Sequence, residues 1–324
     1  MTGIVAAIVT VSVLMLNAGV ASGQTATPNS AQAFPNRPIR IVTASPGSGS
    51  DFAARLIAQG LTDRFGQQVL VDNRFGVAGI ETATRAQPDG YTLYLDGTSF
   101  WVTPLLKSTP YDVMRDFSPI TLAVMSPNIV VVHPSVPANS INELIALAKA
   151  RPGQLNYGSV GTGSGQHLAA ELFKSMTGVN IVHVPYKAIA LAITSTIGGE
   201  IQIVFATTVS ASPHLKSGKL KALAVCSTQP SAIFPGVPTV AASVPGYEFA
   251  ARSGIFTPGK PPAAIVTRLN QEIVRVLNLP EVKEKFLNIG SEIVASSPQE
   301  FTATLQSEVS RMGTLIKNAN IRAD

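Results

Sequence analysis

The sequence predicts an α/β protein in which short strands alternate with helices. Apolar, β-rich runs recur at 39–43, 69–72, 91–95, 129–133, 155–157, 181–184, 201–205 and 220–225. Segments with helical patterns separate most of these runs, and this alternation is typical of largely parallel sheets. A chain of 324 residues is long enough for two ordinary domains and a large core.

The first predicted element precedes this fold. An apolar stretch at 3–16 runs into small residues around Ala21 and Gly23, which is the pattern of a secretory signal rather than of a membrane span. We expect a signal peptide over 1–23, cleaved after Ala21 or Gly23, although no Lys or Arg precedes the apolar stretch. Residues 24–36 are expected to form a flexible leader, since 24–33 is rich in Thr, Ser, Ala, Asn and Gln.

Two glycine-serine loops follow predicted strands and open predicted helices. The first loop has the residues Ser45, Pro46, Gly47, Ser48, Gly49, Ser50 and Asp51. The second loop has the residues Gly158, Ser159, Val160, Gly161, Thr162, Gly163, Ser164 and Gly165, and His167 lies just after it in the first helical turn. Glycines allow several N–H groups to point into one space, and a helix N-terminus adds unpaired donors and a positive dipole end. Each loop is therefore a candidate site for carboxylate or phosphate.

Capping motifs predict the starts of two further helices. Ser140 and Glu143 form a predicted capping box, and the helix they begin ends at 151–153. Ser297 and Glu300 form a second capping box, with proline at the first helical position, and predict a C-terminal helix to about residue 316.

Composition excludes several classes of function. The net charge of +5 is scattered along the chain without basic clusters and interleaved aromatics, which argues against a nucleic-acid surface. The single cysteine, Cys226, lies in an apolar run and is expected in the core. His133, His183 and His214 are isolated in sequence and are expected to be structural, so we expect neither a metal nor a cofactor.

The glycine loops do not match catalytic or nucleotide-binding motifs. Ser164 stands one place too late for a nucleophile elbow, and Gln166 replaces the last glycine of a dinucleotide fingerprint. A phosphate-loop spacing at 254–260 is followed by Pro261 instead of Ser or Thr. A secreted α/β hydrolase that uses Ser159 or Ser164 with His167 remains an alternative.

Many short motifs occur in an order that carries a family resemblance. They include Pro35-Asn36-Arg37-Pro38-Ile39, Pro88-Asp89-Gly90-Tyr91-Thr92-Leu93, Leu155-Asn156-Tyr157-Gly158-Ser159, His183-Val184-Pro185-Tyr186-Lys187, Leu223-Ala224-Val225 and Val237-Pro238-Thr239. With these motifs the sequence resembles the tripartite tricarboxylate transporter substrate-binding proteins, also called the Bug family of periplasmic receptors, over about residues 35–322.

The resemblance implies a type II periplasmic-binding fold, in which two α/β domains are joined by crossover strands around a ligand cleft. We expect domain I at 37–133 and 251–324 and domain II at 134–250, with crossover strands at 128–133 and 252–257. It further implies a periplasmic, non-enzymatic receptor, which we expect to be a monomer. The receptor would bind a small organic carboxylate, such as a di- or tricarboxylate, and deliver it to a membrane permease with a large and a small subunit. A periplasmic sensor module for a signalling partner is an alternative with the same fold.

The resemblance also assigns ligand-binding residues. From one domain these are Gly47, Ser48, Gly49, Ser50 and Asp51, with Thr98 at a neighbouring strand end; from the other they are Ser159, Gly161, Thr162, Gly163, Ser164 and His167, with Thr207. Ala206 stands near Thr207 where many members carry an acidic residue suited to an amino group, so a simple carboxylate is favoured over an amino acid. Arg252 is expected either to bring a cation near the cleft or to lie solvated at a strand edge.

Overall fold

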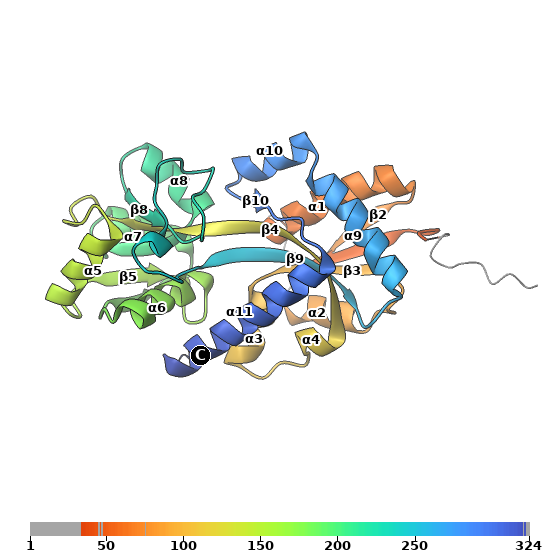
Figure 1. Cartoon of the computed structure of the whole chain (residues 1–324), viewed down its shortest axis with the longest axis horizontal. Coiled ribbons are helices and arrows are strands. Elements are labelled where there is room, and N and C mark those ends of the chain that lie inside the picture. The colour runs from red at the N-terminus through yellow and green to blue at the C-terminus, as the bar shows by residue number, and fades with distance from the viewer. Residues whose placement is uncertain (1–33, 45, 47, 75, 320, 322–324) are drawn as a thin grey trace, which may run out of the picture. The chain divides into compact units, whose positions relative to one another are not determined.

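The computed structural model describes residues 34–44, 46, 48–74, 76–319 and 321 (Figure 1). The predicted signal peptide and residues 24–33 of the predicted leader lie outside the described residues. Each of the eight predicted strands overlaps a strand of the structure, and helices lie between most of them, so the predicted α/β class is confirmed.

One group of parallel strands comes from the first hundred residues. It contains β1 (Ile39–Thr43), β2 (Val69–Asn73) and β3 (Thr92–Gly97), in the order β2-β1-β3. Val42 and Tyr94 belong to a core with α2 and α3, whereas Ile39, Ile41 and Leu93 are fully buried at the alternating positions. Helices cover both faces of these strands, as the alternation of buried residues requires.

A second parallel group comes from the middle of the chain. It contains β5 (Asn156–Ser159), β6 (Val182–Pro185) and β7 (Ile203–Thr207), in the order β7-β5-β6. Ile203 and Phe205 pack in the same cluster as helix α6, and Val204 and Ala206 pack in the cluster that contains residues of α7 and α8.

Two long strands connect the groups. β4 (Phe117–Val132) pairs with β9 (Ala250–Pro258) and β10 (Glu292–Ile293) along its first part and with β7 and β8 (Lys221–Val225) along its second part. Both crossover strands are therefore present, although β4 begins well before its predicted start. Figure 1 shows β4 and β9 running side by side between the two groups.

The helices fall where the connections require them. Their bounds are α1 (Gly49–Phe65), α2 (Val77–Thr84), α3 (Ser99–Leu106), α4 (Val113–Asp116), α5 (Ile141–Ala150), α6 (Gly165–Thr177), α7 (Ile189–Ile197), α8 (Thr208–Lys216), the 3-10 turn η1 (Val240–Ala242), α9 (Ala263–Leu277), α10 (Pro280–Asn288) and α11 (Pro298–Asn318). The capping box of Ser297 and Glu300 is confirmed. At α5 only half of the predicted box forms: Ser140 accepts from the N–H of Glu143, whose own carboxylate accepts from the N–H of Asn139.

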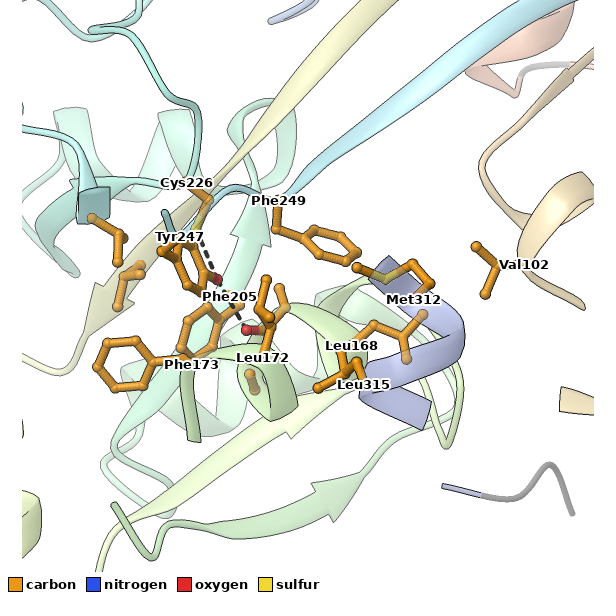
Figure 2. Close-up of a cluster of buried hydrophobic side chains, with 14 of the residues drawn as sticks. Val102, Leu168, Leu172, Phe173, Phe205, Cys226, Tyr247, Phe249, Met312 and Leu315 are labelled. Atoms are coloured by element: carbon orange, nitrogen blue, oxygen red, sulfur yellow. Dashed lines mark hydrogen bonds between the residues drawn. The ribbon is translucent and has the colours of Figure 1, made fainter. Parts of the chain in front are cut away.

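Cys226 lies in the core, as predicted. Figure 2 shows it beside Tyr247, whose hydroxyl donates to the main-chain oxygen of Ala169 at 2.9 Å and lies 3.7 Å from the Cys226 sulfur. Burial raises the pKa of the Cys226 thiol to about 12. The thiol is thus protonated and unreactive at neutral pH.

Candidate functional site

The carboxyl ends of β3 and β7 point toward each other along β4. β3 is antiparallel to β9, and β9 and β7 are both antiparallel to β4, so β3 and β7 run in opposite directions. Gly97 of β3 pairs with Ser253 of β9, which in turn pairs with Val124 of β4. Thr207 of β7 pairs with Asn128 of β4. Four residues of strand correspond to about 13 Å. The loops after the parallel strands therefore converge on the middle of β4, a placement typical of ligand sites in α/β proteins.

The first glycine-serine loop ends in a capped helix. The Ser48 side chain accepts a hydrogen bond from the N–H of Asp51 at 3.1 Å, which begins α1. Ser50 is buried in the first turn, and no atom would lie within 4 Å of a side chain at Gly49. The predicted ligand residue Gly47 lies outside the described residues. The structure thus confirms the helix N-terminus at this loop, with open space beside it.

The carboxylate of Asp51 is already occupied within the protein. It accepts hydrogen bonds from Asn73 at 2.8 Å and from Arg55 at 3.1 Å, and it is buried at 4% exposure. These contacts tie the start of α1 to the end of β2. The Asp51 side chain therefore stabilises the loop through contacts within the protein.

Thr98 also has a partner inside the protein. Its hydroxyl oxygen accepts a hydrogen bond from the N–H of Arg252 at 2.9 Å, which joins the loop after β3 to the crossover strand β9. The sequence-based expectation that Arg252 lies solvated at a strand edge was wrong. The side chain is 8% exposed, and its guanidinium pairs with Glu308 of α11 and with Glu248.

The second glycine-serine loop repeats the design of the first. Ser164 caps α6 by accepting from the N–H of His167 at 3.3 Å. Gly161 and Gly163 have φ of +87° and +80°, a conformation that side-chain-bearing residues rarely adopt. A side chain at Gly163 would collide with Leu106 at the end of α3, whereas one at Gly161 would meet nothing within 4 Å.

The side chain of His167 accepts a hydrogen bond from the main chain of the second loop. Its Nδ1 accepts a hydrogen bond from the N–H of Gly163 at 3.2 Å, so the ring is neutral and carries its proton on Nε2, which lies 4.0 Å from Glu171. Burial, with a smaller contribution from nearby His183, lowers the pKa of His167 to about 4. The imidazole is therefore an uncharged acceptor at neutral pH.

Sequence reasoning missed the partner of Ser159. Its hydroxyl oxygen lies 2.6 Å from Nε2 of His183 and 3.1 Å from the main-chain oxygen of Gly161. Tyr157 and His183 stand at paired positions on β5 and β6, and their rings stack with centroids 5.0 Å apart. Tyr157 and His183 come together through the parallel pairing of β5 with β6, which local sequence patterns do not reveal.

A buried polar group supports these rings. Glu171 accepts hydrogen bonds from the hydroxyl of Tyr157 at 2.7 Å and from Lys174 at 2.6 Å. Burial, followed by the hydrogen bond to Glu171, raises the pKa of Tyr157, so its hydroxyl remains a donor. The second loop thus rests on a cluster of hydrogen-bonded and stacked side chains, namely Tyr157, Glu171, His167 and His183.

At the facing end of β7, Thr207 caps α8. It accepts from the N–H of Ser210 at 3.4 Å and lies opposite Asn128 of β4. Asn128 donates to the main-chain oxygen of Phe205, while its Oδ1 is buried without a hydrogen-bond partner among the described residues. Buried polar atoms usually find partners. Asn128 is therefore an additional candidate that the sequence did not reveal.

The described residues of the predicted site lie at strand ends and helix N-termini. In the described part of the chain, His, Cys, Asp and Glu side chains form no group of three or more that fits a metal ion. Ser159 meets His183 instead of His167, and Ser164 is used as a cap. Helix N-termini with hydroxyl caps suit an anionic ligand.

Fold comparisons place the protein among the periplasmic solute-binding proteins. A structure of Rpa4515 from R. palustris with adipate is 33% identical, with a TM-score of 0.73 over 89% of this chain and 99% of that one. A structure of MatC from Rhodopseudomonas palustris with bound malate is 25% identical, with a TM-score of 0.69 over 87% of this chain and 100% of that one.

The family follows from the sequence comparisons. The family model described as "Tripartite tricarboxylate transporter family receptor" matches residues 53–321. Protein BugT of Bordetella pertussis is 33% identical over 313 residues, which cover 94% of this chain and 95% of BugT. The chain belongs to the tripartite tricarboxylate transporter receptor family, whose members are periplasmic receptors. No helix in the described residues has the length and apolar character needed to cross a membrane.

Proposed function

We propose that this protein binds a small organic carboxylate between the facing strand ends and acts as a receptor without catalysis. The observation that carries the proposal is the convergence of the two capped helix N-termini, at Ser48 and Ser164, with the ends of β3 and β7. A carboxylate that leaves water must regain its hydrogen bonds, and preformed N–H groups supply them without a titrating partner. Relatives bound to adipate and to malate support this class of ligand.

The proposal extends to how the ligand is held and delivered. Residues 37–133 and 251–324 would form one lobe and residues 134–250 the other, so that a ligand touching both loops favours their closed arrangement. The mature protein, monomeric and released from a signal peptide at 1–23, would deliver the ligand to a permease with a large and a small subunit. N-terminal sequencing of the exported protein and stimulated uptake by the permease test these two steps.

Ligand binding is tested with the purified mature protein. Thermal unfolding is measured against mono-, di- and tricarboxylates, with adipate and malate included, and a ligand at one hundred times its dissociation constant adds about 2.7 kcal/mol of stability. No stabilisation by any acid, together with no retained ligand in native mass spectrometry, would contradict the proposal.

A pair of cap variants locates the site. Ser164→Ala removes a helix cap at the second loop, and Ser297→Ala removes the equivalent cap of α11. Each loses about 1 kcal/mol of stability, as caps generally do. We expect only Ser164→Ala to weaken carboxylate binding. Equal carboxylate affinities of the two variants would show that the ligand does not bind at the second loop.

A further inference from the structure

A cavity of about 290 Å³ lies beside the candidate site at the carboxyl ends of β1 and β3. Its lining includes Ala44, which follows β1, and Asp96 and Ser99, which flank the end of β3. Ala44 leads into the first glycine-serine loop, and Ser99 follows Thr98. The cavity, here called the Asp96 pocket, is close to the lower end of the size range of small-molecule sites, about 300–1,000 Å³.

Asp96 places a carboxylate in this pocket, whose lining also includes Lys107 and Arg74, the latter paired with Asp72. Asp96 accepts hydrogen bonds from the hydroxyl of Tyr94 at 2.5 Å and from the N–H of Gly97 at 2.7 Å. Among the described residues, no Lys, Arg or His lies within ion-pair distance of it. A carboxylate has about four acceptor positions, so it can accept further hydrogen bonds.

Aromatic rings form one wall of the pocket. Tyr94, Phe100 and Tyr111 line it, with Phe100 stacked on Tyr111 at 5.2 Å and edge-to-face with Tyr94 at 4.9 Å. The hydroxyl of Tyr111 is committed to the main-chain oxygen of Phe100, and Ile80 adds apolar surface. This wall therefore offers apolar and ring contacts.

We propose that the Asp96 pocket binds the end of the ligand opposite its carboxylate, and that this end carries a hydrogen-bond donor, a hydroxyl or an ammonium, on an aromatic or apolar body. This inference rests on the proposed function. A second carboxylate placed against Asp96 itself would meet a like charge, whereas a donor can occupy the remaining acceptor positions of Asp96. Ala206 leaves the end of β7 without an acidic side chain, and Asp96 would supply one from the end of β3 instead.

The experiment compares three acids that differ only at the far end of one ring. Isothermal titration calorimetry is carried out with benzoate, para-hydroxybenzoate and para-(aminomethyl)benzoate, with adipate as a donor-free diacid. We expect at least one donor-bearing acid to bind roughly tenfold or more tightly than benzoate, as for a hydrogen bond to a charged group. Asp96→Asn should remove most of this preference. The control Asp89→Asn makes the same charge change before the opposite end of β3, where Asp89 pairs with Arg37, and should preserve it.

A second variant keeps the test independent of folding around Asp96. Val77 lines the pocket and is half exposed, so Val77→Phe fills the pocket with little effect on the core. It should weaken the donor-bearing acids and leave adipate unchanged. The pocket proposal alone would be overturned if adipate still binds but the donor-bearing acids bind no more tightly than benzoate. In that case neither Asp96→Asn nor Val77→Phe would change the affinity of any acid. Failure of every carboxylate to bind would overturn the proposed function and the pocket proposal with it.

The pH dependence separates the two donors. Burial raises the pKa of the Asp96 carboxyl. An ammonium pairs best with the ionised form, so the affinity for para-(aminomethyl)benzoate should fall on mild acidification. A hydroxyl can also exchange hydrogen bonds with a protonated carboxyl, so para-hydroxybenzoate should respond less. No difference between the wild type and Asp96→Asn in either pH profile would contradict contact with Asp96.

Discussion

The main-chain N–H of Gly163 donates a hydrogen bond to Nδ1 of His167, with 3.2 Å between the two nitrogens. His167 lies in the first turn of α6, and Gly163 lies in the loop that this helix opens. A histidine accepts at Nδ1 only when that nitrogen is unprotonated. The conformation of the second loop is therefore linked to a neutral, buried imidazole.

Removing this acceptor should loosen the loop. We expect His167→Ala to lower the free energy of unfolding by about 1–3 kcal/mol, because a partly buried N–H loses its partner. His167→Asn, whose side-chain oxygen can take the place of Nδ1, should retain more of the stability and of the carboxylate affinity. Urea denaturation and calorimetry measure the two effects. Equal behaviour of the two variants would show that the hydrogen bond to Gly163 is not what matters.

Acidification should destabilise the protein through the same residue. The pKa of His167 is about 4 in the folded protein and near 6.5 when unfolded, so between these values only the unfolded state binds the proton. The free energy of unfolding should fall as the pH is lowered from about 6.5 to 4, by up to about 3 kcal/mol from this group. Denaturant titrations at a series of pH values test this. The slope should be shallower in His167→Asn, and an unchanged slope would refute the assignment.

The two left-handed glycines of the second loop should differ in their response to alanine. In Gly161→Ala the new Cβ meets no atom within 4 Å, so the variant loses only the free energy of holding alanine at a positive φ, about 1–2 kcal/mol. Gly163→Ala adds a clash, since the new Cβ would lie 2.7 Å from Leu106. Thermal unfolding should rank Gly163→Ala as the less stable variant. Leu106→Ala in the Gly163→Ala background should recover the excess, and no recovery would mean that the clash is relieved in another way.

The ion pair of Arg252 and Glu308 should be required for stability. Both residues are buried, and Glu308 also accepts from the indole N–H of Trp101 at 2.9 Å. Glu308→Gln should lower the free energy of unfolding by about 3 kcal/mol, because it leaves a buried guanidinium with less compensation. The exposed pair of Glu81 and Arg85 gives the control Glu81→Gln, expected to cost at most about 1 kcal/mol. Trp101 is the sole tryptophan of the chain, so its fluorescence reports unfolding in both variants.

The pair of Ser159 and His183 should be structural. Ser159→Ala leaves Nε2 of His183 without its partner, and we expect a loss of about 1–2 kcal/mol in stability together with weaker carboxylate binding. No carboxylate contacts His183 by a hydrogen bond or ion pair in the described part of the chain. Ester hydrolysis by the wild type that disappears in Ser159→Ala would instead revive the hydrolase alternative.

Local signals in the sequence determined much of the fold. The alternation of apolar strands with helices predicted the α/β class, and the capping box at Ser297 predicted the start of α11 at the correct residue. The caps at Ser48 and Ser164 are local as well, because a cap joins residues only three positions apart. The two helix N-termini that the glycine-serine loops open thus followed from the sequence.

Long-range pairing decided the rest. β4 begins at Phe117, earlier than predicted. Its pairing with β9 runs through Pro119 and Pro127, and the register shifts directly after Pro119. Strand register, set by pairing across more than a hundred residues, brings Gly97 opposite Val124 and Thr207 opposite Asn128. The sequence by itself determined the strands and helix starts that flank the two glycine-serine loops, and it predicted these loops as anion sites. Only the tertiary structure decided that they face one another, that Arg252 is buried in an ion pair, and that Asp96 lines a pocket beside them.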